Sequence, residues 1–477
     1  MRWVPITGGE TSIRETIARI DRTGGRGVVV DGQDRPARAV PSERLRTAIF
    51  EGATPDAPVS SVVDGTAESG VESESNTDAG LEGLTDGTTS ERPGAAGTER
   101  ASESNARAVE TVLVVGGAGY IGSVLCRRLL EDGFAVRVLD PLMYGNSGIA
   151  ALKGRDRFTL YRGDARSVGD VLEAIEGVDA VVHLGGIVGD PATALDPRKT
   201  LEYNLHSTQL LASICKYHGL NRFLFASTCS VYGRTDNETG RCAEDGPLNP
   251  VSLYARAKIQ SERVLRDLAD ERFAPTILRM ATVYGHSPRM RFDLVGNVLP
   301  AKAHEKGVVP VFGGDQYRPN VHVEDVARAY RDCLTASFED VAGETFNVGS
   351  NEQNYRIDEL ATVVADAFPD ASIEYHDDRT DERSYRVEFE KLRSRLGFEP
   401  TRTIRDHCLE LRAAFEADAF EATTATRYSN CATLESAPSY EETDRVIETD
   451  EASVREVRDE STPIEAEIGD QRSGGTR

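Results

Sequence analysis

The middle of the chain alternates between two patterns of hydrophobic and polar residues. Short β-branched runs such as 112–115 and 135–139 hold few polar residues, as strands buried on both faces of a parallel sheet require. Longer stretches between the runs, among them 198–217 and 252–270, are predicted to be helices. This alternation predicts an α/β fold with a doubly wound parallel sheet, whose ligand lies at the carboxyl ends of the strands.

A glycine-rich turn joins the first strand of this region to its first helix. The stretch 111–122 ends in Gly-Gly-Ala-Gly-Tyr-Ile-Gly. Its spacing permits a tight turn, a close approach of backbone to a pyrophosphate, and close packing of helix on strand. The pyrophosphate then meets the unpaired N–H groups and the positive dipole end of the helix. The residues expected to bind a dinucleotide are Gly116, Gly119, Tyr120, Ile121 and Gly122.

The second strand of the region ends in an acidic residue. Asp140 follows the glycine turn by about 20 residues, which is the spacing of a dinucleotide-binding unit. A carboxylate there can accept both ribose hydroxyls of NAD and would repel the extra phosphate of NADP. NAD is therefore the predicted cofactor, and the alternative is a solvated turn aspartate before Pro141.

The alternation divides the chain into five parts. A Rossmann-type domain is expected at 109–283 and a smaller substrate-binding cap at 284–415, partly returning to the first domain. Within the cap, helices are predicted at 292–306, 323–337 and 357–367. The segment 64–108 has no aromatic residue and few large aliphatic ones, so it is predicted to be a disordered linker. Residues 1–63 form a small separate segment, and the acidic stretch 416–477 is predicted to be a mostly disordered tail.

Composition narrows the partners and the compartment. The formal net charge of −24 argues against nucleic acid or an anionic membrane as a partner. No apolar run approaches the ~20 residues that span a bilayer, and the N-terminus has no secretory apolar region. The seven cysteines form no Cys-x-x-Cys pair, so we expect no metal site, no disulfide framework and a cytoplasmic protein. The scarcity of lysine on an acidic background suggests a halophilic source.

Two further stretches carry candidate catalytic side chains. Thr228 closes the strand that starts at 222, and Tyr254 and Lys258 lie four residues apart on one face of the next long helix. An ammonium beside a phenol favours the phenolate and lowers the phenol pKa from about 10. Tyr254 is therefore a candidate general base, and Thr228 can hydrogen-bond the reacting oxygen. A Tyr-x-x-x-Lys pair alone is usually ordinary helix surface, but its combination with the glycine turn and Asp140 is specific.

The glycine turn, Asp140, Thr228 and the Tyr254–Lys258 pair follow one another along the chain in this order. Because of these motifs, residues 109–415 resemble the extended short-chain dehydrogenase/reductase superfamily. The resemblance is to its nucleotide-sugar epimerase/dehydratase branch, which includes enzymes like UDP-glucose 4-epimerase. Besides the stretches above, it rests on Gly163-Asp164, His183-Leu-Gly-Gly, Asn204, Leu278-Arg-Met-Ala-Thr-Val-Tyr-Gly and Arg318-Pro-Asn-Val-His. Residues 1–63 weakly resemble a single CBS repeat.

The resemblance implies a tightly held NAD and a set of cofactor contacts. Asp164 would meet the adenine amino group, and Lys258 would also hold the nicotinamide ribose. Leu184, Gly185 and Asn204 would line the cofactor cleft, where family members usually have alanines at positions 185 and 186.

The residues that follow Thr228 narrow the reaction that the resemblance implies. Family dehydratases have Asp and Glu there, and sugar-acid decarboxylases keep a Glu, whereas this chain has Cys229 and Ser230. Epimerisation needs only Thr228, Tyr254 and NAD. Tyr254 takes the hydroxyl proton as hydride passes to NAD, and the keto-sugar turns over before hydride returns. The alternatives are a net dehydrogenase, reductase or dehydratase of a nucleotide sugar, or a non-catalytic NAD-binding regulatory module.

The same resemblance implies a nucleotide-diphosphate sugar as substrate and a homodimer as the assembly. Arg318 matches a family arginine that pairs with the substrate diphosphate, and Arg379 is a weaker candidate of the same kind. Thr282 stands where UDP-sugar epimerases often have an Asn. Family members usually dimerise through the two long helices, here 198–217 and 252–270. The resemblance also suggests a role in polysaccharide biosynthesis.

Overall fold

The computed structural model describes residues 109–235, 240–376 and 383–436, the N-terminal strands, and four single residues near the N-terminus. In the N-terminal segment, β1 (Trp3–Thr7) pairs in parallel with β2 (Gly27–Gly32), which pairs antiparallel with β3 (Arg35–Pro41). Most of the remaining residues of the predicted segment 1–63 lie outside the described residues, as do the linker 64–108, Arg379 and the tail beyond 436.

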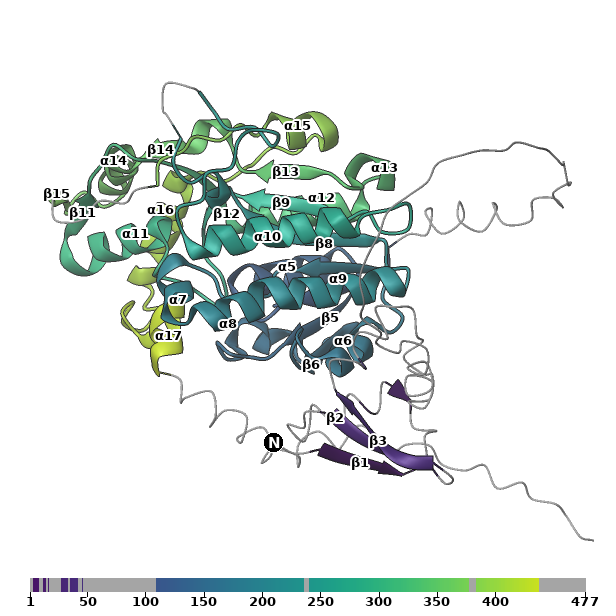
Figure 1. Cartoon of the computed structure of the whole chain (residues 1–477). Helices are drawn as coiled ribbons and strands as arrows, with labels where there is room; N and C mark the ends of the chain where they lie inside the picture. The colour runs from purple at the N-terminus through teal and green to yellow at the C-terminus, as the bar shows by residue number, and fades with distance from the viewer. Residues whose placement is uncertain are drawn as a thin grey trace, which may run out of the picture. The chain divides into compact units, whose positions relative to one another are not determined.

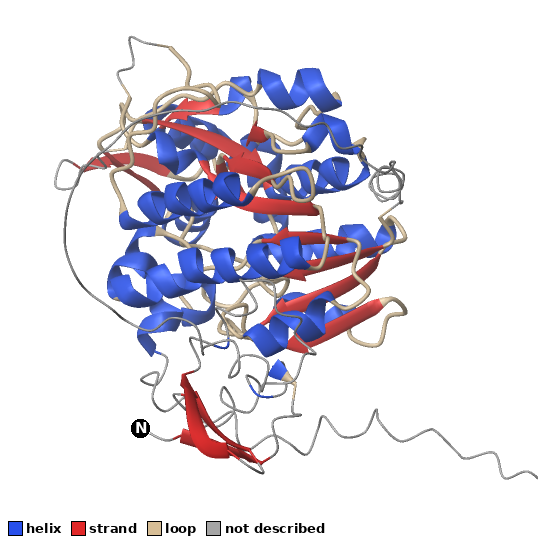
Figure 2. Ribbon diagram, turned by 45° about the vertical axis from the view of Figure 1, so that its right-hand side comes forward, coloured by secondary structure: helices blue, strands red, loops and turns tan. Residues whose placement is uncertain are grey.

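A seven-stranded parallel sheet forms the centre of the folded region (Figure 1, Figure 2). Its strand order is β13-β9-β8-β7-β4-β5-β6, which reverses direction beside β4 as in a doubly wound sheet. The strands are β4 (Thr111–Val115), β5 (Ala135–Asp140), β6 (Phe158–Arg162), β7 (Ala180–His183), β8 (Arg222–Thr228), β9 (Thr276–Met280) and β13 (Thr345–Val348). The predicted fold class is confirmed.

Helices cover both faces of this sheet because successive strand residues point to opposite sides. Val112 and Val114 of β4 pack toward α5 (Tyr120–Glu131) and α12 (Val323–Thr335). Leu113 and Val115 pack in the second cluster, which is covered by α6 (Val168–Ile175), α9 (Ser207–Tyr217) and α10 (Leu253–Leu268). All of these strand residues are at least 98% buried, which explains the continuous apolar run.

The helix predicted at 198–217 has a more complex form. It consists of α8 (Pro197–Leu201), a π-helical turn at Glu202–His206 and then α9. A further short helix, α7 (Asp190–Leu195), precedes it. Figure 1 shows α9 and α10 lying alongside each other over the strands.

The predicted cap is built on two small sheets. The first contains β10 (Thr282–Tyr284), β12 (Tyr317–His322) and β14 (Asn354–Arg356), and the second contains β11 (Val308–Phe312) and β15 (Ser372–His376). The helices α11 (Val295–Lys306), α14 (Ile357–Ala367) and α16 (Ile404–Glu416) pack around a third apolar cluster, and α15 spans Glu390–Leu396. Between these elements the chain returns to the main sheet through α12, α13 (Phe338–Val341) and β13.

The folded region extends beyond the predicted boundary at 415. Residues 417–433 include a 3-10 turn at Thr426–Tyr428 and the start of α17 (Asn430–Ser436). Phe292 lies 5.2 Å from Phe420 and 5.1 Å from Tyr428 between ring centroids, so an aromatic cluster holds this segment in place. Among the described residues, no helix has both the length and the apolar character needed to cross a bilayer.

Candidate active site

A cavity of about 660 Å³ lies at the carboxyl ends of the central strands. Of the predicted site residues, those that line it are Thr228, Tyr254, Lys258, Gly116, Gly119, Tyr120, Ile121, Gly122, Asp140, Asp164, Leu184, Gly185, Thr282 and Arg318. The structure thus brings nearly all of the predicted residues to one place. Asn204 is the exception among the predicted residues that the structure describes, and Arg379 lies outside the described residues.

The glycine turn forms a cradle that has no room for side chains. Gly116 adopts a φ of +82°, and a Cβ on it would lie 2.8 Å from the amide nitrogen of Gly185. A Cβ on Gly122 would lie 2.3 Å from the carbonyl oxygen of Gly116. No side chain caps the first turn of α5 at Gly119, so the helix end presents its N–H groups to the cavity. These features fit the diphosphate of a dinucleotide.

Two carboxylates mark the other end of the cofactor cleft. The carboxylate of Asp140 accepts hydrogen bonds from the backbone N–H of Ala118 at 3.0 Å and of Leu142 at 2.8 Å. Burial raises the pKa of Asp140, and these hydrogen bonds act against that rise. Asp164 forms an ion pair with Arg166 at 2.7 Å. Both carboxylates border the cavity, as an adenosine site requires.

The three candidate catalytic residues come from adjoining elements. Thr228 is the last residue of β8, Tyr254 lies in the first turn of α10, and Lys258 lies one turn further along the same helix. Ser252 begins α10 by accepting a hydrogen bond from the backbone N–H of Ala255 at 3.2 Å. The Thr228 side chain lies close enough to Tyr254 to lower the pKa of its phenol. Lys258 donates to the carbonyl of Ala226 at 2.7 Å.

The electrostatics of this group differ from the sequence prediction. Burial raises the pKa of Tyr254, and the Asp190 carboxylate raises it further, whereas Arg291 and the nearby Thr228 side chain lower it. The predicted lowering of the phenol pKa is therefore wrong in direction for this structure. The reason is that burial removes the water that would stabilise a phenolate. Burial also lowers the pKa of Lys258 to about 8.

Charged residues from the cap region form the substrate side of the cavity. Arg318 is only 5% exposed, and its guanidinium lies 5.5 Å from the ring of Tyr385. Asp190, at the start of α7, forms an ion pair with Arg383 at 2.7 Å. The sequence analysis missed Asp190, although its electrostatic effect on Tyr254 places a carboxyl group near the candidate base.

Asn204 has a different position from the one that the resemblance implied. Its side-chain oxygen accepts from the backbone N–H of Ile187 at 2.7 Å, and its amide nitrogen donates to the carbonyl of Ile187 at 2.9 Å. Asn204 is fully buried and does not border the cavity. It instead holds the loop 184–190, which carries Leu184 and Gly185 into the cavity wall.

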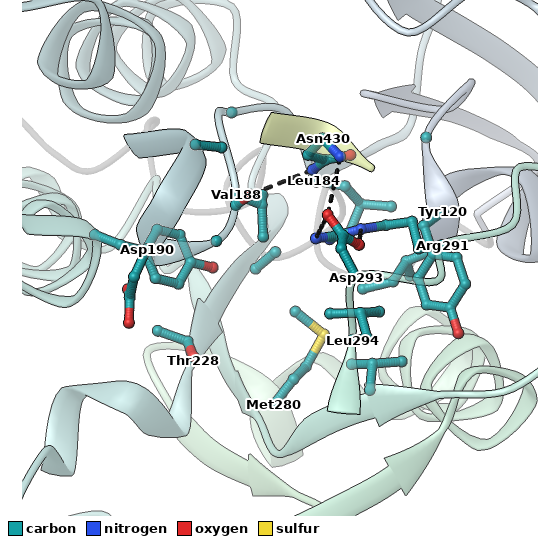
Figure 3. Close-up of a pocket in the computed structure, with 18 of the residues that line it drawn as sticks. Tyr120, Leu184, Val188, Asp190, Thr228, Met280, Arg291, Asp293, Leu294 and Asn430 are labelled. Atoms are coloured by element: carbon teal, nitrogen blue, oxygen red, sulfur yellow. Dashed lines mark hydrogen bonds and ion pairs between the residues drawn. The ribbon is translucent and has the colours of Figure 1, made fainter. Parts of the chain in front are cut away.

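Two loops that sequence reasoning did not assign complete the wall (Figure 3). In the loop 285–293, Arg291 pairs with Asp293 at 2.8 Å. Asn430, from beyond the predicted domain, donates its backbone N–H to Asp293 at 2.9 Å and its side-chain N–H to the carbonyl of Val188 at 3.2 Å. No motif described above covers residues 286–293 or 426–433.

The doubly wound sheet, the glycine cradle and the Thr–Tyr–Lys group together define an α/β enzyme that uses a dinucleotide. The profile of the NAD dependent epimerase/dehydratase family matches residues 112–349. The chain is 31% identical over 265 residues to UDP-glucose 4-epimerase of Bacillus subtilis, covering 50% of this chain and 77% of that protein. The chain therefore belongs to the NAD dependent epimerase/dehydratase family.

Solved structures give the same result. UDP-glucuronic acid 4-epimerase from Bacillus cereus, solved with UDP-glucuronic acid and NAD, is 26% identical with a TM-score of 0.58, covering 65% of this chain and 100% of that one. A dTDP-glucose 4,6-dehydratase from Streptomyces venezuelae, solved with NAD, is 28% identical with a TM-score of 0.58, covering 65% and 98%. The predicted family and the predicted NAD cofactor are confirmed.

Proposed function

We propose that this chain is an NAD-dependent epimerase that acts on a nucleotide-diphosphate sugar. The observation that carries the proposal is the grouping of Thr228, Tyr254 and Lys258 in one cavity with the glycine cradle. Relatives with this activity, including UDP-glucose 4-epimerase, support it. Bound NAD supplies the reversible acceptance of hydride from a carbinol carbon of the sugar.

The catalytic residues have separate tasks in this proposal. Tyr254 takes the proton of the reacting hydroxyl and later returns it. Thr228, which borders the cavity beside Tyr254, hydrogen-bonds the same oxygen of the substrate. Lys258 is held in place by the carbonyl of Ala226. Its ammonium lies 4.6 Å from the ring of Phe225, a contact that keeps the charge within the buried site.

The substrate end is built for a nucleotide diphosphate. Arg318 provides a buried guanidinium, which suits bidentate pairing with phosphate. Thr282 borders the same part of the cavity. An apolar surface for the base and sugar comes from α11, β11 and the start of α14, through Val298, Leu299, Pro310, Phe312 and Ile357.

The residues beside Thr228 favour epimerisation over elimination. Cys229 donates its thiol hydrogen to the carbonyl of Arg279 at 3.2 Å, and burial raises its pKa, so it is not an acid in this site. A dehydratase is the second candidate function, because Asp190 could supply the carboxyl group that elimination uses. The Asp190 carboxylate, however, forms an ion pair with Arg383.

The test is a panel of nucleotide sugars incubated with the purified protein without added cofactor. We expect NAD to be released in stoichiometric amount on denaturation, and one sugar to be converted to its epimer at unchanged mass. A product lighter by one water would replace epimerase with dehydratase. Conversion only with added NAD or NADPH would replace it with dehydrogenase or reductase.

The proposal extends to the assembly and the setting of the enzyme. We place a homodimer contact on the segment 198–217 and on α10. Three leucines of that segment are partly exposed: Leu201 at the end of α8, Leu205 in the π-helical turn and Leu210 in α9. The acidic, lysine-poor composition suits a salt-rich cytoplasm, and the substrate class suits polysaccharide biosynthesis. Light scattering at several salt concentrations tests the dimer, and a monomer throughout would exclude it.

A further inference from the structure

We propose that Arg289 is a cofactor-binding residue, whose guanidinium pairs with the NAD diphosphate beside the glycine cradle. Nothing in the motifs of the sequence assigned a role to this arginine. The proposal rests on NAD binding and not on the proposed epimerase activity. It is carried by the burial of Arg289, by two guanidinium nitrogens that make no hydrogen bond to any described residue, and by the network that fixes its loop.

The guanidinium of Arg289 is buried at the cavity without a partner. Arg289 is only 4% exposed, and its Nε and Nη2 atoms make no hydrogen bond in the part of the chain that the structure describes. Its carbon Cζ lies 4.6 Å from the centre of the Tyr144 ring. A buried cation without a hydrogen-bonded anion is costly, so the site is incomplete until an anion binds.

The charges around Arg289 agree with this interpretation. Burial and the neighbouring Arg291 lower the pKa of Arg289 to about 10. Asp293, the nearby carboxylate of the same loop, is already paired with Arg291 at 2.8 Å. Asp140 accepts from two backbone N–H groups. Both carboxylates act on Arg289 through space, but neither forms a hydrogen bond with it in the part of the chain that the structure describes. An anionic ligand would supply that hydrogen bond.

A buried network attaches the loop of Arg289 to the helix that carries the cradle. The Tyr120 hydroxyl donates to the carbonyl of Gly285 at 2.6 Å and accepts from the side chain of Asn297 at 3.0 Å. Ser287 donates to the carbonyl of Tyr120 at 2.7 Å, and its hydroxyl lies 3.0 Å from that of Ser123. These bonds fix the loop on the first turn of α5.

The position of the Arg289 Cβ atom indicates which part of NAD the guanidinium contacts. A Cβ built on Gly148 would lie 2.6 Å from the carbonyl oxygen of Ala118, in the glycine turn, and 3.0 Å from the Cβ of Arg289. The arginine therefore lies beside the cradle. A diphosphate on the N-terminus of α5 is the nearest anion that the cofactor offers, and guanidinium pairs with it in bidentate geometry. Asp140 disfavours a further phosphate on the ribose.

The experiment compares Arg289→Met and Arg289→Lys with Arg128→Met. Arg128 lies on the same helix α5, but it is half-exposed and forms an ion pair with Asp132 at 3.2 Å. NAD per chain is measured after desalting, and its dissociation constant is measured by calorimetry on protein stripped of cofactor. Binding of UDP and dTDP to the NAD-loaded protein is measured in parallel, because a substrate diphosphate is the other possible source of the anion.

We expect Arg289→Met to weaken NAD binding by about 10- to 100-fold, because a charge-assisted hydrogen bond is lost. Arg289→Lys should lie between, Arg128→Met should match the wild type, and diphosphate binding should not change. Retention of NAD by Arg289→Met overturns the proposal, as does a loss confined to UDP or dTDP binding. Circular dichroism and the Arg289→Lys variant separate a loss of NAD contact from a loss of fold. No sugar conversion is measured, so the result stands whether or not the epimerase proposal does.

Discussion

The two walls of the cavity are built in different ways. The sheet wall consists of strand ends and helix starts, whose positions are fixed by ladder hydrogen bonds such as those between β8 and β9. The loop wall consists of 285–293 and 426–433, and side-chain bonds hold it in place. The sheet wall carries Thr228 and Tyr254. The loop wall carries Arg289, Arg291 and Asn430.

This difference indicates how the enzyme divides its tasks. The rigid wall holds the reacting groups, for which small displacements are costly. The other wall can change its side chains without disturbing the sheet, because loops tolerate variation better than the elements they connect. We therefore expect variants of the sheet wall to lose chemistry, and variants of the loop and cap residues to change binding.

The largest effect is expected for Tyr254→Phe. Removal of the hydroxyl should lower kcat by about 10²- to 10⁴-fold, the usual contribution of general acid–base catalysis. The variant should keep its bound NAD, because the glycine cradle is unchanged. Tyr217→Phe, which removes a hydroxyl from the exposed face of α9, is the control. Full activity in Tyr254→Phe would assign the chemistry to another group.

A smaller effect is expected for Arg318→Met, on the substrate side. Loss of its charge-assisted hydrogen bonds should raise KM by about 10- to 100-fold, with little change in kcat or in bound NAD. Arg412→Met removes an arginine from the surface of α16 and serves as the control. A fall in kcat at constant KM would show that Arg318 acts in the chemical step rather than in binding.

Asp190→Asn should shift the pH dependence of the reaction. The Asp190 carboxylate raises the pKa of Tyr254, since a negative neighbour disfavours the phenolate. Its removal, which also frees the positive charge of Arg383, lowers that pKa. The acidic limb of the kcat profile should therefore move to lower pH, while Asp156→Asn on the surface leaves it in place. A shift to higher pH would contradict the assignment of Tyr254 as base.

The smallest effect is expected for Asn430→Ala. This change removes the hydrogen bond to Val188 and leaves the backbone bond to Asp293. The free energy of unfolding in urea should fall by about 0.5–1.5 kcal/mol. Asn146→Ala, whose side chain makes no capping bond, is the control. Loss of tightly bound NAD in Asn430→Ala would show that the loop wall has a larger role than packing.

The sheet wall was predictable because its signals are local. The glycine turn, Asp140 and the Tyr254–Lys258 pair each depend on spacing within one strand–helix unit, and the structure brings them into one cavity. Their roles stay predictions until variants are measured. The direction of the Tyr254 pKa shift was missed because its largest cause is burial, which spacing does not reveal.

The loop wall was not predictable for a related reason. The hydrogen bond between Asn430 and Val188 joins residues 242 positions apart, and the bond between Tyr120 and Gly285 spans 165. No local pattern specifies such contacts. Asn204 shows the same limit. The resemblance implied that it lines the cofactor cleft, but its side chain hydrogen-bonds the backbone of Ile187 instead.

The return of the chain through α12 and β13 has a consequence for protein engineering. These two elements belong to the main sheet and its helical layer, although they lie in sequence between parts of the cap. Residues 284–415 are therefore not an exchangeable module, and a chimaera that replaced them as a block would remove an edge strand together with the substrate site. New specificities are better grafted as separate segments, with 285–293 and 426–433 transferred as a matched pair.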